Sequence, residues 1–326
     1  MINDSKGFNM YGLKKDVFCE IPTKHFSLED YGKGVARWCP GCGDHAVLNA
    51  TQKLLRDKQL DPANTVFVSG IGCSSRFPHY MNTYGFHGLH GRAFPVASGI
   101  KFRRPDLDVF AITGDGDCLS IGAGAWIHAI RYNMDMTVLL LNNQIYGLTK
   151  KQISPTSRLG TVSNTTPEGS VIPPLKPLQT TLGVANASFV AQTADWNPAH
   201  LYETIKAGFE HKGFSFIHVI QRCPVFQSSL VDELTSNKEK IYYLEHDDGI
   251  TVSPDVAKTF KHKHVHDPSN LGAARDLACD TENIYLGLFY KNPQAVRYDL
   301  YGAANMGFTI EEKAAVLNAE FDKYAI

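Results

Sequence analysis

The stretch VFAITGDGD at residues 109–117 joins a short apolar run to an acidic, glycine-containing turn. A second apolar run, VLLL at residues 138–141, ends in the pair Asn142-Asn143. Apolar runs of this length, followed by turn residues, are typical of strands buried in a parallel sheet. Residues 119–132, between the two runs, have the length and composition of a crossover helix. This unit predicts an α/β fold with a doubly wound, mostly parallel sheet.

Two oxygen-bearing side chains follow these predicted strands. Asp115 stands in the turn after the first run, and Asn143 comes directly after the second. Because parallel strands end at the same edge of a sheet, both side chains are expected to meet there. A carboxylate and an amide oxygen suit Mg²⁺, which prefers oxygen ligands and keeps substrate phosphates in its shell. The pattern resembles the thiamine diphosphate motif, which implies a thiamine diphosphate-binding fold of the PP type and adds the backbone oxygen of Ile145 as a third metal ligand.

Residues around the glycine turn are expected to bind the diphosphate. Gly116 has no Cβ, so its backbone can approach a diphosphate closely, and N–H groups at a helix start favour anions. Gly116 and Asp117 are therefore expected to touch the diphosphate or its metal shell. His90 and Ser98 precede the first strand and are candidates to line the cofactor groove, the alternative being a polar loop outside it. The alternative for the turn itself is an ordinary βαβ connection.

Four cysteines form a second candidate site. Cys39 and Cys42 make a CxxC motif, Cys73 follows a predicted strand at residues 65–69, and Cys223 follows the last apolar strand. Four thiolates accept either Zn²⁺ or a 4Fe-4S cluster. A zinc staple ordinarily draws on two close cysteine pairs, whereas two of these four are solitary and follow strand ends, on the rim of the glycine turn. This arrangement favours the 4Fe-4S cluster over zinc.

Seven short motifs occur along the chain in an order typical of one enzyme family. They are CPGCGDH (39–45), GIGCSSR (70–76), HGRA (90–93), GDGD (114–117), NNQIYGLTK (142–150), SPT (154–156) and RCP (222–224). Together they resemble the β subunit of the two-subunit 2-oxoacid:ferredoxin oxidoreductases, most of all those acting on 2-oxoglutarate. One departure is Lys151, which stands where the family commonly has glycine after the TK pair.

The resemblance implies that Cys39, Cys42, Cys73 and Cys223 hold one 4Fe-4S cluster. The turn and the resemblance together give a set of residues expected around the thiamine diphosphate. They are Ile71, Gly72, Cys73, Ser74, His90, Ser98, Gly116, Asp117, Gly147, Leu148, Thr149, Lys150 and Gln152. For catalysis, we expect Leu148 to pack against the cofactor ring. Arg76 is expected to pair with the substrate carboxylate through a bidentate fork, or else to form a structural ion pair.

The implied reaction is the reversible oxidative decarboxylation of 2-oxoglutarate to succinyl-CoA and CO2. Thiamine diphosphate, Mg²⁺ and one 4Fe-4S cluster are the implied cofactors, coenzyme A is the co-substrate, and ferredoxin accepts the electrons. Pyruvate as the substrate is one alternative. A non-redox thiamine diphosphate decarboxylase subunit with structural zinc is another, and a catalytically idle cofactor-binding subunit is a third.

Enzymes with this cofactor need a carboxylate against the aminopyrimidine, supplied by a second αβ domain. Residues 223–326 show neither the length nor the strand and helix alternation of such a domain. We therefore expect an α subunit that carries it, in an αβ or α2β2 assembly. The chain is divided into an N-terminal arm (1–38), a cofactor domain with the iron–sulfur site (39–230) and a C-terminal extension (231–326) that packs on the partner or the active site.

Composition excludes several classes of protein. With a net charge of −1 and 20% charged residues over 326 positions, the chain lacks the broad basic surface of a nucleic-acid-binding protein. No apolar run approaches the ~20 residues that cross a bilayer, and residues 1–15 lack the apolar core of a signal peptide. A cytoplasmic protein without membrane contact is expected. Three further cysteines, Cys19, Cys118 and Cys279, are given no role in the site.

Two basic tracts are rival candidates for steering an acidic ferredoxin. They are KFRR at residues 101–104 and the lysine- and histidine-rich residues 258–266. The alternating histidines of the second tract are more typical of a solvated strand or loop than of a metal site.

Overall fold

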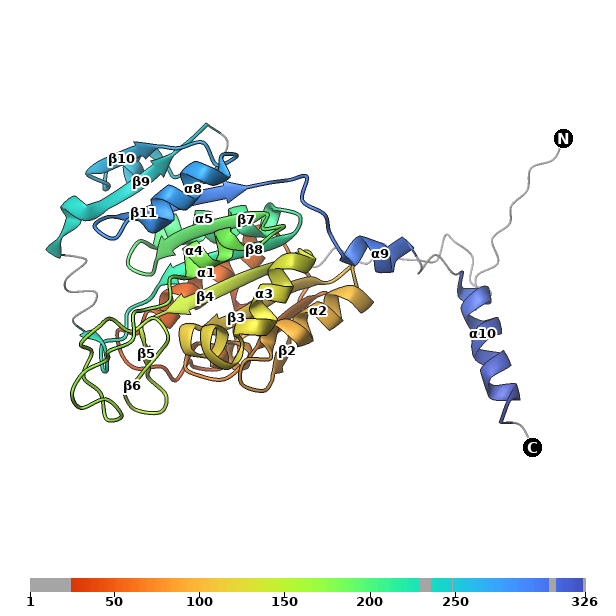
Figure 1. The fold of residues 1–326 in the computed structure, drawn as a ribbon. Helices are drawn as coiled ribbons and strands as arrows, with labels where there is room; N and C mark the ends of the chain where they lie inside the picture. The colour runs from red at the N-terminus through yellow and green to blue at the C-terminus, as the bar shows by residue number, and fades with distance from the viewer. Residues whose placement is uncertain (1–24, 229–235, 248, 305–308, 325–326) are drawn as a thin grey trace.

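The computed structural model describes residues 25–228, 236–247, 249–304 and 309–324. Its centre is a nine-stranded sheet with the strand order β10-β9-β11-β7-β8-β4-β3-β1-β2, covered by helices (Figure 1). Neighbouring strands are parallel except β7 and β11, which run antiparallel. The predicted α/β fold with a mostly parallel sheet is confirmed. Cys19 lies outside the described residues.

The strands of the main sheet are β1 (Thr65–Ser69), β2 (Tyr84–His87), β3 (Asp108–Gly114), β4 (Met136–Asn142), β7 (Phe189–Ala194), β8 (Phe214–Ile220), β9 (Ile241–Glu245), β10 (His262–Val265) and β11 (Ile284–Lys291). A separate hairpin consists of β5 (Ile145–Tyr146) and β6 (Gln152–Ile153). The helices are α1 (Asp44–Asp57), α2 (Ala93–Arg103), α3 (Ala123–Tyr132), α4 (Pro177–Gly183), α5 (Pro198–Glu210), α7 (Pro254–Ala257), α8 (Leu271–Cys279), α9 (Asp299–Ala304) and α10 (Ile310–Asp322).

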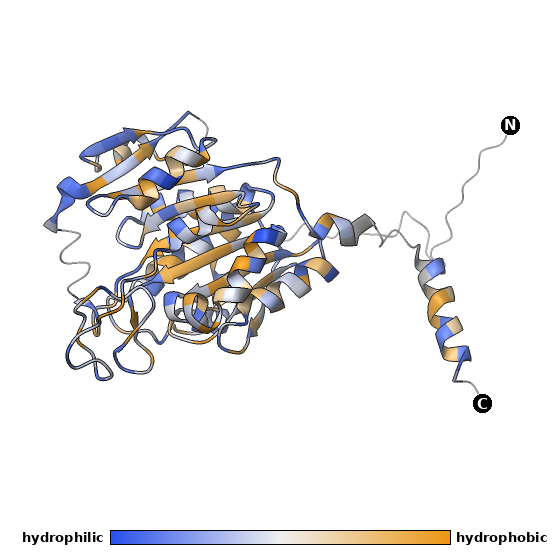
Figure 2. Cartoon of the chain, in the orientation of Figure 1, coloured by the Kyte–Doolittle hydropathy of each residue, from blue (hydrophilic) through white to orange (hydrophobic). Residues whose placement is uncertain are grey.

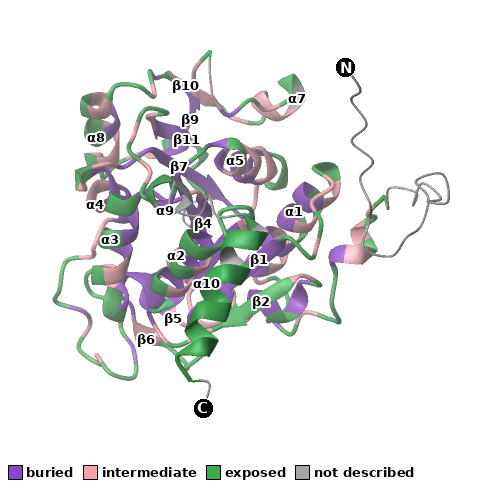
Figure 3. Ribbon diagram, turned by 90° about the vertical axis from the view of Figure 1, so that its right-hand side faces the viewer, coloured by how far each residue is buried: buried purple, intermediate pink, exposed green. Residues whose placement is uncertain are grey.

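Helices cover both faces of the sheet, and the side chains of β4 show how the two cores divide. Val138 and Leu140 pack in a cluster with α2, α3, α4 and α8, while Leu139 and Leu141 pack in a second cluster with α1 and α5. All of β4 is buried. Because a central parallel strand is buried on both faces, its sequence is continuously apolar rather than alternating. Figures 2 and 3 show these central strands as apolar and buried.

The parallel strands β1, β3, β4 and β8 end at one edge of the sheet. The residue pairs Ser69–Ile112, Gly114–Leu141 and Asn142–Ile220 are in register across them. The glycine turn, the asparagine pair and two of the cysteine-bearing loops follow these strand ends. The fold therefore brings both predicted sites to one edge, as expected for ligand sites in open parallel sheets.

The crossover helix expected over residues 119–132 begins differently. A short π-helical turn, η4 (Asp117–Ile121), follows Gly116, and α3 starts only after Gly122. A Cβ on Gly122 would lie 2.6 Å from the carbonyl oxygen of Asp117, so glycine is required at this tight junction. Single π-turns of this kind often stand at functional sites.

The C-terminal part differs from the expectation. Strands β9, β10 and β11 extend the main sheet, with α7 and α8 between them, so residues after 223 do alternate strand and helix and the opposite expectation is wrong. The apolar run IYLGLFYK of β11 is typical of a buried strand, so this part of the sheet could have been predicted from the sequence. β10 is polar because it forms the edge of the sheet and alternates half-buried and exposed residues, as expected for a solvated strand. These strands belong to the same sheet and form no second cofactor-binding domain.

Among the described residues, no helix is long and apolar enough to cross a membrane.

Candidate functional site

A cavity of about 430 Å³ opens at the strand edge, above the glycine turn. It contains every residue expected to hold the cofactor or the Mg²⁺ except Ser98 and Lys150. Its lining consists of Ile71, Gly72, Cys73, Ser74, His90, Gly114, Asp115, Gly116, Asp117, Leu141, Asn143, Ile145, Tyr146, Gly147, Leu148, Thr149 and Gln152. Residues from four separate segments of the chain thus meet around one space.

The oxygen donors expected for Mg²⁺ gather at this cavity. Asp115 is 3% exposed, and burial raises the pKa of its carboxyl group. Asn143 and Ile145 line the same cavity, and the Asn143 side-chain oxygen accepts a hydrogen bond from the N–H of Ile145 at 3.1 Å. A buried carboxylate is costly without a compensating charge, and a divalent cation supplies one. The donor set therefore fits Mg²⁺.

The two asparagines after β4 point to different places. The Asn142 side chain contacts Nε2 of His218 at 2.9 Å and accepts a hydrogen bond from the Thr156 hydroxyl at 2.8 Å. It lines a second cavity, of about 390 Å³, on the other side of the strand end. Asn143, not Asn142, faces the cavity of Asp115, in agreement with the position expected for the metal ligand.

Glycines leave space for the ligand and for a neighbouring ring. Gly72 has a φ of +130° and no atom within 4 Å of the place where a Cβ would stand, so its backbone opens onto the cavity. A Cβ on Gly116 would lie 2.3 Å from the ring of Tyr146, whose hydroxyl donates to the Gly116 carbonyl at 2.8 Å. Tyr146 thus packs directly on the glycine turn. A backbone cradle of this kind fits a diphosphate.

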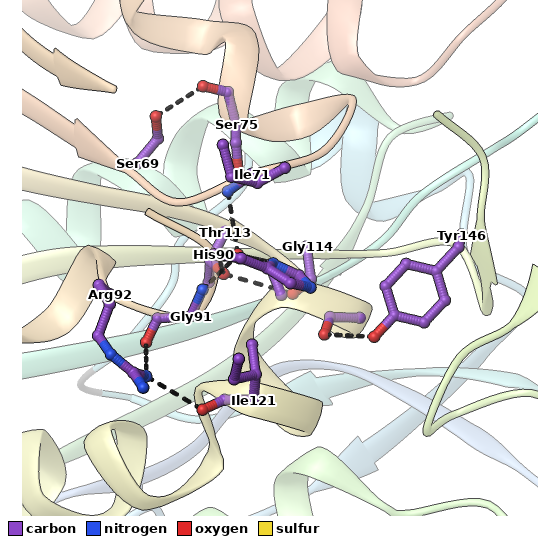
Figure 4. A network of polar contacts seen from close by, with 12 residues as sticks. Ser69, Ile71, Ser75, His90, Gly91, Arg92, Thr113, Gly114, Ile121 and Tyr146 are labelled. Carbon is purple, nitrogen blue, oxygen red and sulfur yellow. Dashed lines mark hydrogen bonds and ion pairs between the residues drawn. The ribbon is translucent and has the colours of Figure 1, made fainter. Parts of the chain in front are cut away.

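Asp117 organises the loops around the cavity, and Figure 4 labels the residues that contact its carboxylate, Ile71, His90, Gly91 and Thr113. Its carboxylate accepts hydrogen bonds from the N–H groups of Ile71 and Gly91, at 3.0 and 2.7 Å, and from the Thr113 hydroxyl at 2.8 Å. Nδ1 of His90 lies 2.6 Å from the same group. Four contacts occupy this carboxylate, so its side chain positions the loops, and its contact with the diphosphate or the metal shell stays a prediction.

Three of the expected site residues lie outside the cavity lining. Ser98 stands within α2, and Lys150 is exposed with a φ of +69°. Arg76 donates to the Arg37 carbonyl at 3.3 Å, and its guanidinium carbon lies 5.8 Å from the centre of the Tyr80 ring. These are structural contacts for Arg76, and its pairing with a substrate carboxylate stays a prediction.

Sequence reasoning missed the residues that hold Asp115. The hydroxyls of Ser154 and Thr156 donate to the Asp115 carboxylate at 2.5 and 2.7 Å. Both belong to the SPT motif in the long segment 150–177, where three neighbouring hydroxyl side chains in a loop without periodicity are the available signal. The segment is therefore part of the site rather than a loose connection.

The four cysteines lie around the end of β1 and the loop after β8. A Cβ on Gly147 would lie 3.6 Å from the sulfur of Cys73 and 3.8 Å from that of Cys223, so these two thiols are close together. The Cys42 sulfur accepts a hydrogen bond from the Gln221 amide at 3.3 Å. Cys39 is exposed. Cys73 also lines the cofactor cavity, so the thiol group and the cavity share a wall.

The electrostatics of the thiols shows that they interact with one another. Burial first, and then the negative charges of Asp44, Cys223 and Cys39, raise the pKa of Cys73 to about 12. Burial likewise raises the pKa values of Cys42 and Cys223. Buried thiols become thiolates when a metal is bound. The set therefore fits a positively charged inorganic group better than four free thiols.

A single zinc ion and a 4Fe-4S cluster require different spacings between the four cysteine sulfurs. Within the described ranges, no three His, Cys, Asp or Glu side chains are grouped so that they could hold a metal ion. A single zinc ion requires its four sulfurs about 2.3 Å from one centre, whereas a cubane places four irons between its thiolates and spaces them further apart. The choice of a 4Fe-4S cluster over zinc stays a prediction.

Comparisons with known proteins agree with this site. The model of the family described as thiamine pyrophosphate enzyme, C-terminal TPP binding domain, matches residues 70–219. The 2-oxoglutarate oxidoreductase subunit KorB of Mycobacterium tuberculosis is 46% identical over 66% of this chain, which covers 58% of that relative. The 2-oxoacid:ferredoxin oxidoreductase 1, subunit beta, of Aeropyrum pernix is 39% identical over 80% of both chains. The sequence thus places the chain beside these proteins over most of its length.

A solved structure gives the same result. The structure of 2-oxoglutarate:ferredoxin oxidoreductase from Magnetococcus marinus, with 2-oxoglutarate, coenzyme A and succinyl-CoA bound, matches with a TM-score of 0.76 and 34% identity. The match covers 91% of this chain and 97% of that one, so it includes most of the chain after residue 223.

Proposed function

Because this chain belongs to the beta subunits of the 2-oxoacid:ferredoxin oxidoreductases, we propose that it catalyses, together with an α subunit, the reversible oxidative decarboxylation of 2-oxoglutarate. The products are succinyl-CoA and CO2, and the electrons leave through one 4Fe-4S cluster to ferredoxin. The names of four relatives support 2-oxoglutarate over pyruvate, and the Magnetococcus structure has 2-oxoglutarate and coenzyme A bound.

The position of Cys73 carries this proposal. It lines the cofactor cavity, and its sulfur and that of Cys223 lie near the same point, the Cβ position of Gly147. A cluster held by these thiols would stand against the wall of the cofactor cavity. Such contact is needed if electrons released at the cofactor are to be removed one at a time. A structural zinc site has no need of that position.

Residues of this chain would hold the cofactor as follows. Asp115, Asn143 and the Ile145 carbonyl would bind Mg²⁺, and the Gly116 turn would bind the diphosphate. When bound, thiamine diphosphate supplies the nucleophile and the electron sink for cleavage of a 2-oxoacid. Leu148, which is 49% exposed, presents an apolar surface at the cavity mouth on which a cofactor ring can pack.

The remaining half of the active site would come from the α subunit. The described residues form one large sheet with its helices and the small hairpin of β5 and β6, and none of the cavity-lining residues is a glutamate. We propose that the partner supplies the carboxylate that faces the aminopyrimidine. Exposed apolar side chains that line the cavity, Ile71 and Leu148, give the partner a surface to cover.

The test uses the complex purified with its α subunit. We expect about four irons and four sulfides per chain, and an electron paramagnetic resonance signal of a reduced cluster on addition of 2-oxoglutarate and coenzyme A. A substrate panel should show the highest kcat/KM for 2-oxoglutarate with methyl viologen as acceptor. Zinc in place of iron, or decarboxylation without reduction of any acceptor, would show that the chain belongs to a non-redox enzyme.

A further inference from the structure

Residues 32–40 present an exposed cationic surface next to the cysteine group. Lys33 and Arg37 are exposed, and neither makes a salt bridge with any residue that the structure describes. Their backbone N–H groups donate to the carbonyl and the hydroxyl of Tyr80, both at 3.0 Å, which holds the segment in place. Arg76 lies over the same tyrosine ring. Tyr80 therefore contacts three cationic residues, Lys33 and Arg37 through their backbones and Arg76 through its guanidinium.

This surface has an apolar centre and a direct connection to the cysteines. Val35, between the two cations, is 85% exposed. Trp38 is buried, and its indole N–H donates to the carbonyl of Cys73 at 2.7 Å. Cys39, the next residue, is exposed. Val35 thus stands four residues before the exposed Cys39, in a segment that Trp38 ties to the loop of Cys73.

The two basic tracts singled out in the sequence are neutralised within the chain. Lys101 is buried and donates to the Leu107 carbonyl at 2.8 Å, and Arg104 pairs with Asp106 at 2.6 Å. In the second tract, Lys263 pairs with Glu245 at 2.8 Å, and Lys261 and His262 both contact Glu239. Paired charges contribute little to long-range attraction, so neither tract remains a good candidate for steering an acidic protein.

We propose that Lys33, Val35 and Arg37, here called the 33–37 surface, form the docking site for the acidic electron-acceptor protein. The cations would steer the acceptor, Val35 would be covered on docking, and exposed Cys39 would bring the cluster close to the acceptor's redox centre. The inference rests on the proposed function, because it takes the four cysteines to hold a cluster. A small, charge-steered contact is what a transient electron-transfer partner needs.

The experiment measures acceptor reduction by the assembled complex carrying Lys33→Glu and Arg37→Glu together. With 2-oxoglutarate and coenzyme A saturating, kcat/KM for ferredoxin should fall at least about tenfold at low salt, the lower end of the effect of electrostatic steering. The salt dependence of that constant should also flatten. Reduction of methyl viologen, which needs no docking surface, should stay unchanged. The double variant Lys238→Glu/Lys240→Glu, an equal reversal of two charges on the exposed turn η5 (Lys238–Lys240), is the matched control and should change neither rate.

The outcomes separate the docking site from the proposed function. Ferredoxin kinetics within twofold of the wild type, with viologen reduction intact, would overturn the docking site alone. Loss of the α subunit from the purified double variant would also overturn it, because the surface would then belong to the subunit interface. An inactive wild-type complex with both acceptors would instead contradict the proposed function. If the double variant loses viologen reduction, the single variants Lys33→Gln and Arg37→Gln are tested instead. In each of them the rate of ferredoxin reduction divided by the rate of viologen reduction should fall below the wild-type ratio, and an unchanged ratio would overturn the docking site.

Discussion

The hydroxyl of Thr156 lies 2.7 Å from the carboxylate oxygen of Asp115 and 2.8 Å from the side-chain oxygen of Asn142. A residue of the long segment 150–177 therefore bridges the glycine turn after β3 and the asparagine pair after β4. Ser154 reaches the same carboxylate oxygen of Asp115 at 2.5 Å. Because both hydroxyls are buried, the carboxylate proposed to bind Mg²⁺ is held in one orientation before any ligand arrives.

Replacing Thr156 should therefore weaken the binding of Mg²⁺. A hydrogen bond to a charged group contributes about 1.5–3 kcal/mol, so Thr156→Val should raise the Mg²⁺ concentration that half-saturates thiamine diphosphate binding about tenfold or more. Titration calorimetry of the cofactor at a series of Mg²⁺ concentrations measures this. Thr156→Ser keeps the hydroxyl and should bind like the wild type. Equal Mg²⁺ requirements for the valine variant and the wild type would show that the bridge has no positioning role.

A methyl group on Gly116 should displace the Tyr146 ring. The added Cβ would lie 2.3 Å from that ring, far inside contact distance, so Gly116→Ala should lower the affinity for thiamine diphosphate at least about tenfold. Replacing the Tyr146 ring by the smaller leucine side chain, in the double variant Gly116→Ala/Tyr146→Leu, should restore part of that affinity, because the added methyl group no longer clashes with a ring. Equal losses in the single and double variants would mean that the glycine is needed for a reason other than the ring, such as the approach of the diphosphate itself.

The sequence predicts those features that depend on the residue pattern of a single segment. The central strands could be predicted because double-sided burial makes them continuously apolar, as at Val138 and Leu141. The shared strand edge then follows from the parallel topology, which is why Asp115 and Asn143 could be placed at one site before the structure was known.

Other features depend on contacts between distant parts of the chain. Nothing near Asp117 in sequence shows that its carboxylate would be occupied by Ile71, His90 and Gly91, which lie on two other loops. The pairing of Lys263 with Glu245 required the register of β9 and β10, so the tract looked free in the sequence. Likewise β10 lacks an alternation of apolar and polar residues, because an edge strand buries little side-chain surface. Its position in the sheet depends on its pairing with β9 and could not be predicted from its own residues.

Cys39 and Cys279, which are both exposed, offer a matched test of the cluster. Cys39→Ala should lower the iron content and the visible absorbance of the purified complex, because a four-thiolate site loses one ligand. Cys279→Ala, at the end of α8 (Leu271–Cys279), should leave both unchanged. Iron and sulfide analysis with absorption spectroscopy measures the difference. Full iron content in the Cys39 variant would remove that residue from the ligand set.

Buried His200 should make the stability of the protein depend on pH. The residue is 0% exposed, its Nδ1 contacts the Thr193 hydroxyl at 2.8 Å, and burial lowers its pKa from 6.5 to about 3. Between these values the unfolded chain binds a proton that the folded chain does not. The free energy of unfolding should therefore be highest above pH 6.5 and fall as the pH drops toward 3, by up to about 1.4 kcal/mol per pH unit from this residue.

Removing the titrating ring should flatten that dependence. In His200→Gln, the free energy of unfolding should fall less steeply between pH 6.5 and 4.5 than in the wild type, even if the variant is less stable at pH 8. Denaturant titrations at a series of pH values measure the slope. His128→Gln, which changes an exposed histidine on α3, should keep the wild-type slope. If His200→Gln keeps that slope too, other buried groups such as His211 and His218, whose pKa values are also lowered by burial to about 4, determine the acid sensitivity.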